Sequence, residues 1–426
     1  MDSSAPTIAV IDGYLTGGLL APLFRAHNMP VVHVHSAATS YEYGLATYRA
    51  GDYVASIEHS GDVEETARRL AVLGVRHVVS GSETGSDVGD ELAQELQLDT
   101  ANSPGFSHAR RDKRTMHRLL YESGVPVPWQ RHLGADGQVV WETPGPEPSK
   151  VVVKPSSSAG TDSVHICQHG GERARAITSI MTSHNIYGCA NDGIIVQEFL
   201  DGPEYMINTV SVDGAHSCIE IWRSEKKLVD KSPVYDMQML EDPESESMIG
   251  VIEYAFEILT TLGVKWGVAH TEVIVTTSGP LLLETATRVP GGNNQALALA
   301  AMGTSVLDEM LLVYAAPEEV VARGRTRKLR RAAMGVSLIM PYDGEIVLPI
   351  DSAELRRLPS YFGCRINGAV GDRVCRTVDV FSKPGTAYLC HERRAQVDRD
   401  YHEVRRWESR EFARAVRVSQ YDRDSS

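Results

Sequence analysis

The chain has 426 residues, of which 42% are hydrophobic and 23% are charged. This is the composition of a globular protein of about three domains, at roughly 150 residues each, and it excludes a wholly disordered chain. The net charge of −14 argues against nucleic acid as a partner, because proteins that bind the phosphate backbone present basic surfaces.

The six cysteines are scattered along the chain, and none forms a C-x-x-C pair. We therefore expect reduced thiols, with neither a zinc ribbon nor a disulfide framework. The first residues lack the basic and apolar segments of a signal peptide. No stretch approaches the ~20 apolar residues of a membrane helix. We expect a soluble, cytoplasmic protein that has no membrane partner.

The first hundred residues alternate between short apolar runs and segments with helical spacing. The runs that predict strands lie at 7–11, 31–34, 53–57 and 77–80, and the predicted helices lie at 64–73 and 87–96. This alternation predicts an α/β fold with a parallel, doubly wound sheet. Ligands of such sheets bind beyond the carboxyl ends of the strands, which makes the loop at 81–85 a candidate binding loop.

The middle of the chain begins with a predicted helix that opens at Arg110 and ends at the breakers of 124–128. A loop rich in proline and glycine, 143–149, then precedes a predicted strand at 151–154. The part from 336 onward has short apolar runs with turn signals, and it ends in a charged tail from Ala395 that we expect to be helical.

A lysine, Lys154, ends the strand at 151–154, and the small residues of 156–161 follow it. Small side chains leave backbone N–H groups uncovered, and together with a lysine they suit the oxygens of a phosphate group. The G-x-x-x-x-G-K order of a Walker A loop is absent. A plain surface turn is the alternative interpretation.

A second apolar run, 194–196, leads into Gln197 and then into a Gly-Pro turn that is followed by Glu204. The backbone at the edge of such a strand can pair with an adenine ring. A carboxylate a few residues further on can accept hydrogen bonds from ribose hydroxyls. This stretch is therefore a candidate nucleoside site.

Two acids lie on a predicted β-hairpin. Glu272 is on the strand at 270–275 and Glu284 is on the returning strand, and the Gly-Pro turn between them brings the two acids side by side. A structural ion pair with Arg288 is one explanation. Magnesium ligation is the better one, because Mg²⁺ favours one or two carboxylates together with phosphate oxygens. The guanidinium of Arg288, beside exposed backbone N–H groups, suits a developing oxyanion or an acyl phosphate.

In this order and spacing, the motifs resemble those of ATP-grasp enzymes of the carboxylate–amine ligase type. The chain is most similar to the L-amino-acid ligases, which make dipeptides, and the stretch at 111–128 matches the usual beginning of the ATP-grasp domain in that group. The resemblance covers nearly the whole chain. It implies a pre-ATP-grasp domain at 1–105, an ATP-grasp domain at 106–335 with lobes at about 128–200 and 201–335, and a small β-rich domain with a helical tail at 336–426.

The resemblance also implies roles for individual residues. ATP would be held by Lys113, Lys154, Ser156, Ser157, Ser158, Gly160, Thr161, Gln197, Glu198, Phe199, Leu200 and Glu204. One or two Mg²⁺ ions, for which Mn²⁺ can substitute, would be bound by Glu272 and Glu284. The catalytic groups would be Arg288, Lys154, Gly291 and Gly292.

Candidate substrate residues are Glu83, His270, Tyr235, Asp236 and Asn293. Glu83 could bind the α-amino group of an amino acid, or it could be an ordinary acid of a surface loop. His270 could contact substrate, or it could only satisfy the end of a strand.

Two positions depart from the usual ATP-grasp pattern. Ala286 stands where many of these enzymes carry an asparagine that binds metal, which leaves the number of metal ions open. Gln197 stands where the hinge often carries an acid, although its carbonyl can still accept a hydrogen bond from adenine.

The implied reaction forms an amide. A carboxylate attacks the γ-phosphate of ATP to give an acyl phosphate, and an amine then displaces phosphate. We expect small-molecule substrates, a place in the assembly of peptide-like natural products, and a homodimer. The alternatives are a bicarbonate-activating ligase of the same fold and an ATP-binding protein without turnover. A dehydrogenase is disfavoured because the first loop lacks G-x-G-x-x-G.

Overall fold

The structure is a computed structural model that describes residues 6–36, 42–158, 163–185, 188–229, 232–292, 295–380 and 382–418. Its N-terminal part is built on a parallel sheet with the strand order β3-β2-β1-β4. The strands are β1 (Thr7–Ile11), β2 (Val31–His35), β3 (Ala55–Glu58) and β4 (Val75–Ser80). The helices are α1 (Leu20–Ala26), α2 (Glu42–Leu45), α3 (Val63–Val72) and α4 (Ser86–Glu95).

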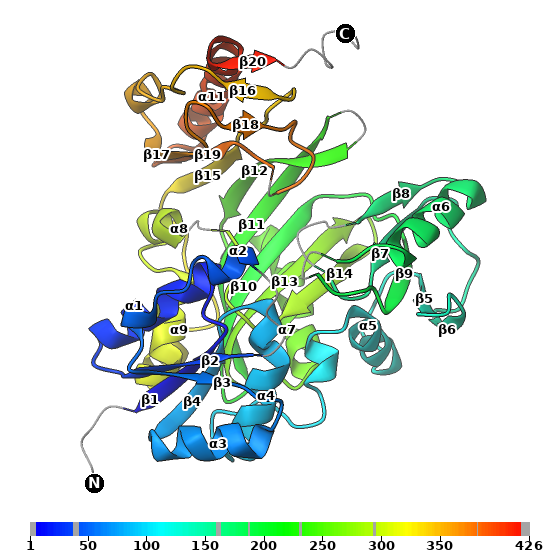
Figure 1. Cartoon of the computed structure of the whole chain (residues 1–426), viewed down its shortest axis with the longest axis vertical. Helices are drawn as coiled ribbons and strands as arrows, with labels where there is room; N and C mark the ends of the chain where they lie inside the picture. The colour runs from blue at the N-terminus through cyan, green and yellow to red at the C-terminus, as the bar shows by residue number, and fades with distance from the viewer. Residues whose placement is uncertain are drawn as a thin grey trace.

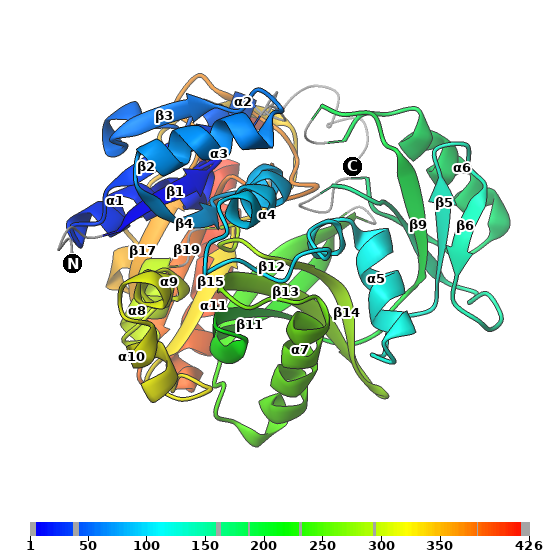
Figure 2. The same ribbon diagram turned by 90° about the horizontal axis from the view of Figure 1, so that it is seen from below.

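Helices cover both faces of this sheet. Successive side chains of a strand point to opposite faces, and in β1 the side chains on both faces are apolar and buried. On one face Ile8 and Val10 pack with Phe24 of α1. On the other face Ala9 and Ile11 pack with side chains of α3 and α4. The predicted doubly wound α/β arrangement is therefore confirmed, and Figures 1 and 2 show it in blue and cyan.

Helix α5 (Lys113–Glu122) precedes a small lobe that contains strands β5 to β9. Its antiparallel sheet has the order β6-β5-β9-β7-β8. The strands are β5 (Gln130–Gly134), β6 (Val139–Glu142), β7 (Val151–Pro155), β8 (His165–Cys167) and β9 (Gly193–Glu198). Helix α6 (Gly170–Met181) packs on this sheet, and the lobe has a hydrophobic core of its own.

A large antiparallel sheet of eight strands forms the centre of the molecule, in the order β14-β13-β10-β11-β12-β15-β19-β17. Its strands are β10 (Glu204–Val212), β11 (Ala215–Val229), β12 (Ser232–Glu241), β13 (Gly267–Thr276), β14 (Gly279–Ala286), β15 (Ala332–Ser337), β17 (Tyr361–Ile366) and β19 (Gly385–His391). Helix α7 (Ile249–Thr261) packs on one face. Helices α8 (Gln295–Met302) and α9 (Val306–Ala315) pack on the other face, and α10 (Pro317–Ala322) follows them.

The sheet continues through the boundary that the sequence places between residues 335 and 336. That boundary falls within β15, which pairs with β12 on one side and with β19 on the other. The C-terminal part adds helix α11 (Arg394–Ala415) and a short sheet of β16 (Gly344–Ile346), β18 (Arg373–Val374) and β20 (Val416–Val418). Figure 1 shows this part at the top, above the end of the large sheet.

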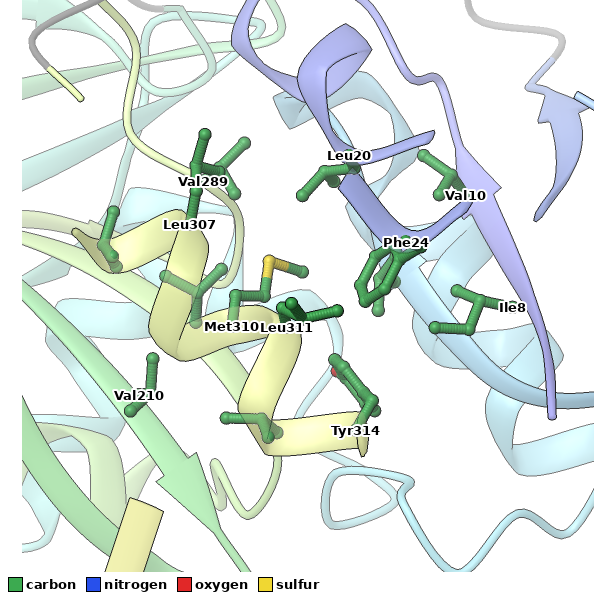
Figure 3. Close-up of a cluster of buried hydrophobic side chains, with 14 of the residues drawn as sticks. Ile8, Val10, Leu20, Phe24, Val210, Val289, Leu307, Met310, Leu311 and Tyr314 are labelled. Atoms are coloured by element: carbon green, nitrogen blue, oxygen red, sulfur yellow. The ribbon is translucent and has the colours of Figure 1, made fainter. Parts of the chain in front are cut away.

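One hydrophobic core joins the N-terminal part to the large sheet. Figure 3 shows Phe24 of α1 facing Met310 and Tyr314 of α9, with Val210 of the large sheet beyond them. The rings of Phe24 and Tyr314 meet edge to face, with centroids 6.2 Å apart. Among the described residues no single helix is long and apolar enough to cross a membrane. Only α8 and α9 taken together pass such a test, and these two helices meet at 84°.

Candidate active site

The two acids of the hairpin lie where the sequence predicts them. Glu272 of β13 is directly opposite Glu284 of β14 in the antiparallel register. The Lys113 ammonium, at the start of α5, is 2.7 Å from a carboxylate oxygen of Glu284 and donates a second hydrogen bond of 2.7 Å to the carbonyl of Ser158. Nε2 of His270 is 3.2 Å from Glu272 Oε1. Each acid therefore faces a basic group.

Charge governs the protonation of this cluster. Burial alone would raise the pKa of Glu284, but Lys113, Lys154 and Arg288 outweigh it and lower the pKa to about 2. Burial opposes the charge on Lys113, yet its acidic neighbours raise the pKa. Burial and the nearby Lys113 lower the pKa of Lys154 to about 8. Buried cations set against carboxylates can exchange those partners for the oxygens of a polyphosphate and its metal ion.

The predicted nucleoside residues line the neighbouring strands. Lys154 of β7 donates a 3.2 Å hydrogen bond to the side-chain oxygen of Gln197 on β9. Glu204, at the start of β10, pairs with Lys226 at 2.6 Å through Oε2. In the part of the chain that the structure describes, Gln197 Nε2 and Glu204 Oε1 are buried without a hydrogen-bond partner. A nucleoside offers acceptors and hydroxyls that would satisfy both atoms.

The carbonyl of Gln197, expected to accept a hydrogen bond from adenine, already accepts one from Lys154. The residues that follow are fixed by other contacts. Glu198 accepts a hydrogen bond from the backbone N–H of Trp129, the ring of Phe199 lies 3.3 Å from the Lys150 ammonium, and Leu200 is buried. The backbone N–H groups of Glu198 and Phe199 also donate hydrogen bonds, to the carbonyls of Trp129 and Lys150.

Three serines begin the small-residue loop. Ser156 donates a 2.9 Å hydrogen bond to Asp192, and the carbonyl of Ser157 accepts one of the same length from Asn185. The carbonyl of Ser158 is held by Lys113, as described above. Gly160 and Thr161, as well as Asn293 beyond β14, lie outside the described residues.

Arg288 reaches the N-terminal part of the molecule. Its Nε donates a 2.7 Å hydrogen bond to Oε2 of Glu83, and its Nη1 donates one of 3.0 Å to the carbonyl of Val289. Glu83 follows β4, so it lies at the carboxyl edge of the parallel sheet, between the neighbouring strands β1 and β4. This is the switch point at which open α/β sheets bind ligands.

Close packing of glycines gives the Glu83 loop its position. A Cβ added to Gly81 would lie 2.7 Å from the Cα of Gly13, and one added to Gly17 would lie 2.0 Å from the carbonyl oxygen of Gly81. Thr84 donates a 2.6 Å hydrogen bond to the buried carboxylate of Asp12. The loop after β4 is therefore locked against the loop after β1.

The structure separates two of the predicted substrate residues. Tyr235 lies beside the acids, with the Lys226 ammonium 4.8 Å from its ring centroid, and burial together with Glu204 raises its pKa well above the usual value. Asp236 is on the opposite face of β12, where Lys227, Tyr401 and Arg405 bind it. The prediction that Asp236 lines the site is not supported, because neighbouring residues of a strand point to opposite faces.

The remaining predicted residues can also be located. Gly291 and Gly292 are exposed after β14, and no atom lies within 4 Å of where their Cβ would be. Ala286 is opposite His270 in the hairpin. In the described ranges no group of three His, Cys, Asp or Glu side chains is arranged to hold a metal ion. The opposed carboxylates of Glu272 and Glu284 are a pair of the kind that Mg²⁺ binds together with phosphate oxygens.

Sequence reasoning missed Lys226, whose ammonium pairs with Glu204. It also missed Asn208 and Glu220, which are buried behind His270. Lys226 was missed because it forms, with Lys227, a pair of consecutive lysines, a pattern typical of a solvent-exposed surface. Asn208 and Glu220 could have been noticed from the sequence, although only weakly, because an amide and an acid in otherwise apolar strands need hydrogen-bond partners.

Comparison with known proteins places this geometry in a class. Residues 110–292 match the ATP-grasp domain family. The L-amino acid ligase from Bacillus licheniformis superposes with a TM-score of 0.72 at 16% identity, over 96% of this chain and 98% of that protein. Carboxyaminoimidazole ribonucleotide synthase from Aspergillus clavatus, complexed with ATP, gives a TM-score of 0.66 at 13% identity, over 96% and 99%. The fold is the ATP-grasp fold.

The chain is also 27% identical to dapdiamide A synthase of Enterobacter agglomerans over 406 residues, which span 93% of this chain and 95% of that protein. Residues 110–292 thus form an ATP-grasp domain, and the likeness to these ligases supports an ATP-dependent enzyme of the carboxylate–amine ligase type, which forms a C–N bond.

Proposed function

We propose that the enzyme condenses two amino acids, or an amino acid and a related amine, through an aminoacyl phosphate. The pairing of Glu83 with Arg288 carries this proposal. A carboxylate and a guanidinium that face each other at a switch point are complementary to a zwitterion. The α-ammonium of a donor amino acid would take Glu83, and its carboxylate would take Arg288. Bicarbonate is an anion with no ammonium group, so Glu83 would disfavour it.

The nucleotide would occupy the other half of the site. Lys113 and Lys154 would bind the phosphates, and the free Oε1 of Glu204 would accept a hydrogen bond from a ribose hydroxyl. Glu272 and Glu284 would hold Mg²⁺, which neutralises the charge that collects on the phosphates. Lys226 pairs with Glu204, the proposed ribose ligand, and would therefore place a further positive charge beside the nucleotide.

Two steps follow from this placement. An oxygen of the donor carboxylate attacks the γ-phosphorus, its bond to phosphorus forms, and ADP leaves. The neutral amine of the acceptor then attacks the carbonyl carbon and the C–N bond forms. The bond from that carbon to the phosphate oxygen breaks, so that inorganic phosphate leaves, and the nitrogen gives up one proton to the phosphate or to water. Arg288 would stabilise the negative oxygen of the tetrahedral intermediate, since in this proposal its guanidinium binds the donor carboxylate.

The test is phosphate release from Mg-ATP with single amino acids, with pairs of amino acids, and with bicarbonate, followed by mass spectrometry of the products. We expect release that requires a particular pair, and a product mass equal to the pair minus one water. The Arg288→Ala and Glu284→Ala variants serve as inactive controls. Release that needs bicarbonate and no amino acid would establish the carboxylase-type alternative. ATP binding without any release would establish the binding-only alternative.

A further inference from the structure

A chain of buried polar side chains runs behind the acidic hairpin. Asn208 of β10 is opposite Glu220 of β11 and also opposite His270 of β13. Nδ2 of Asn208 donates to Oε2 of Glu220 at 2.9 Å, and the side-chain oxygen of Asn208 is 2.7 Å from Nδ1 of His270. The relative exposures of the three residues are 2%, 1% and 6%. None of the reactions described above uses Asn208 or Glu220.

The direction of each hydrogen bond follows from Glu220. The indole N–H of Trp222, which can only donate, donates to Oε2 at 2.8 Å, and the backbone N–H of Val306 donates to Oε1 at 2.7 Å. An ionised Glu220 can only accept, so the NH₂ group of Asn208 faces its Oε2. The amide oxygen of Asn208 then faces His270, whose Nδ1 must carry a proton. Nε2 is thereby directed at Glu272 Oε1, 3.2 Å away.

The backbone supports the same arrangement. The ladder between β10 and β11 has a bulge between Asn208 and Thr209. Bulges occur next to active sites, where they redirect a side chain. Val306 begins helix α9, which Ser305 caps with a capping box. Glu220 is therefore anchored to a rigid helix end as well as to the sheet.

We infer that Glu220 and Asn208 are positioning residues, which hold the ring of His270 by its Nδ1 proton and so keep the lone pair of Nε2 beside the carboxylate of Glu272. The inference rests on the proposed function, because Glu272 is the carboxylate that we propose binds the metal ion. Partners of this kind set the orientation of a ligand, and their loss typically weakens metal binding about 10–100-fold.

The first measurement is nitrogen NMR of the native protein labelled with ¹⁵N-histidine, at a pH where the rings are neutral. A His270→Gln variant assigns the signal. We expect the proton of neutral His270 on Nδ1, the less common tautomer of free histidine in water. A proton on Nε2 would overturn the inference. The measurement needs no substrate, and the His270→Gln variant serves only to assign the signal.

The second measurement is Mn²⁺ binding in the presence of saturating ADP, followed by electron paramagnetic resonance. We expect Asn208→Leu to weaken Mn²⁺ about 10–100-fold. The matched control is Thr271→Val, which removes a buried 2.8 Å hydrogen bond to Thr285 of β14, on the face of β13 opposite to His270. It should lower the melting temperature similarly and change Mn²⁺ affinity less than about twofold.

Equal Mn²⁺ affinities in Asn208→Leu and Thr271→Val would contradict a positioning role. Absence of Mn²⁺ binding in the native protein with ADP would remove the metal assignment of Glu272 and the inference with it. A missing dipeptide product, in contrast, would remove only the proposed substrates, since neither measurement contains an amino acid.

Discussion

Replacement of Glu83 by glutamine separates the recognition of a zwitterion from the rest of the chemistry. Glutamine keeps the shape and one oxygen acceptor but loses the charge that we propose holds the α-ammonium group. A hydrogen bond to a charged group contributes about 1.5–3 kcal/mol. The side chain of Glu83 is 21% exposed, and solvent screens such a contact, so the lower end applies.

A loss of about 1.5 kcal/mol corresponds to roughly a tenfold change. We therefore expect Glu83→Gln to raise the KM for the donor amino acid about tenfold, and to leave the KM for ATP within about twofold. The assay is phosphate release under saturating ATP and acceptor, with the donor varied. Glu91→Gln, an exposed acid of the adjacent helix α4, is the matched control and should behave as the native enzyme.

The decisive comparison uses a donor analogue in which hydrogen replaces the amino group. The native enzyme should have a much higher KM for this analogue than for the amino acid. The Glu83→Gln substitution should raise the KM for the analogue only slightly further. If Glu83→Gln instead weakened the analogue as strongly as the amino acid, the role of Glu83 would be to position Arg288, and the zwitterion argument would be refuted.

Three other predictions concern the charges and the packing. Lys113→Met should reduce phosphate release at least about 100-fold, because a buried carboxylate loses its partner; binding of free Mn²⁺, measured without nucleotide, should become tighter than in the native protein. The pKa of Lys154 is lowered to about 8, so its charge is present below that pH and is lost above it; the Kd of ATP, measured by calorimetry, should rise above pH 8, and Lys154→Arg should keep the affinity flat to pH 9. Gly81→Ala should destabilise the fold by about 1–3 kcal/mol in urea unfolding, because the new Cβ would meet the backbone of Gly13; Gly51→Ala, which has open space, should not.

Much of the fold can be read from local patterns. The predicted strands 7–11 and 31–34 agree with β1 and β2 to within one residue, and the tail predicted from Ala395 is helix α11, which begins at Arg394. Periodicity reports local structure and burial, so it serves well here. It says nothing of distant pairing partners. The pairing of β12 with β15, which carries the large sheet into the C-terminal part, therefore had no signal in the sequence.

In the candidate site, too, local sequence patterns predict some features, whereas contacts between distant residues depend on the tertiary fold. The hairpin brought Glu272 and Glu284 to the same end as the sequence predicts, but their direct opposition depends on a register shift between Glu272 and Val273 that the spacing does not give. The contact between Glu83 and Arg288 joins residues 205 positions apart, and only the tertiary fold creates it. The side chain of Asp236 could have been excluded earlier, because Tyr235 and Asp236 are consecutive in a strand and cannot both face the acids.

The core of Figure 3 has a consequence for how the enzyme accommodates its ligands. Phe24, Met310 and Val210 belong to one hydrophobic cluster that packs the N-terminal sheet against the large sheet, whereas the small lobe has a separate hydrophobic cluster. Glu83 and Arg288, which we propose select the donor, thus both belong to the part of the molecule that this core holds together. We expect closure over the nucleotide to be a movement of the small lobe toward this part of the molecule. Donor selectivity is then set before ATP arrives, and changes in the small lobe can tune turnover while leaving the choice of amino acid intact.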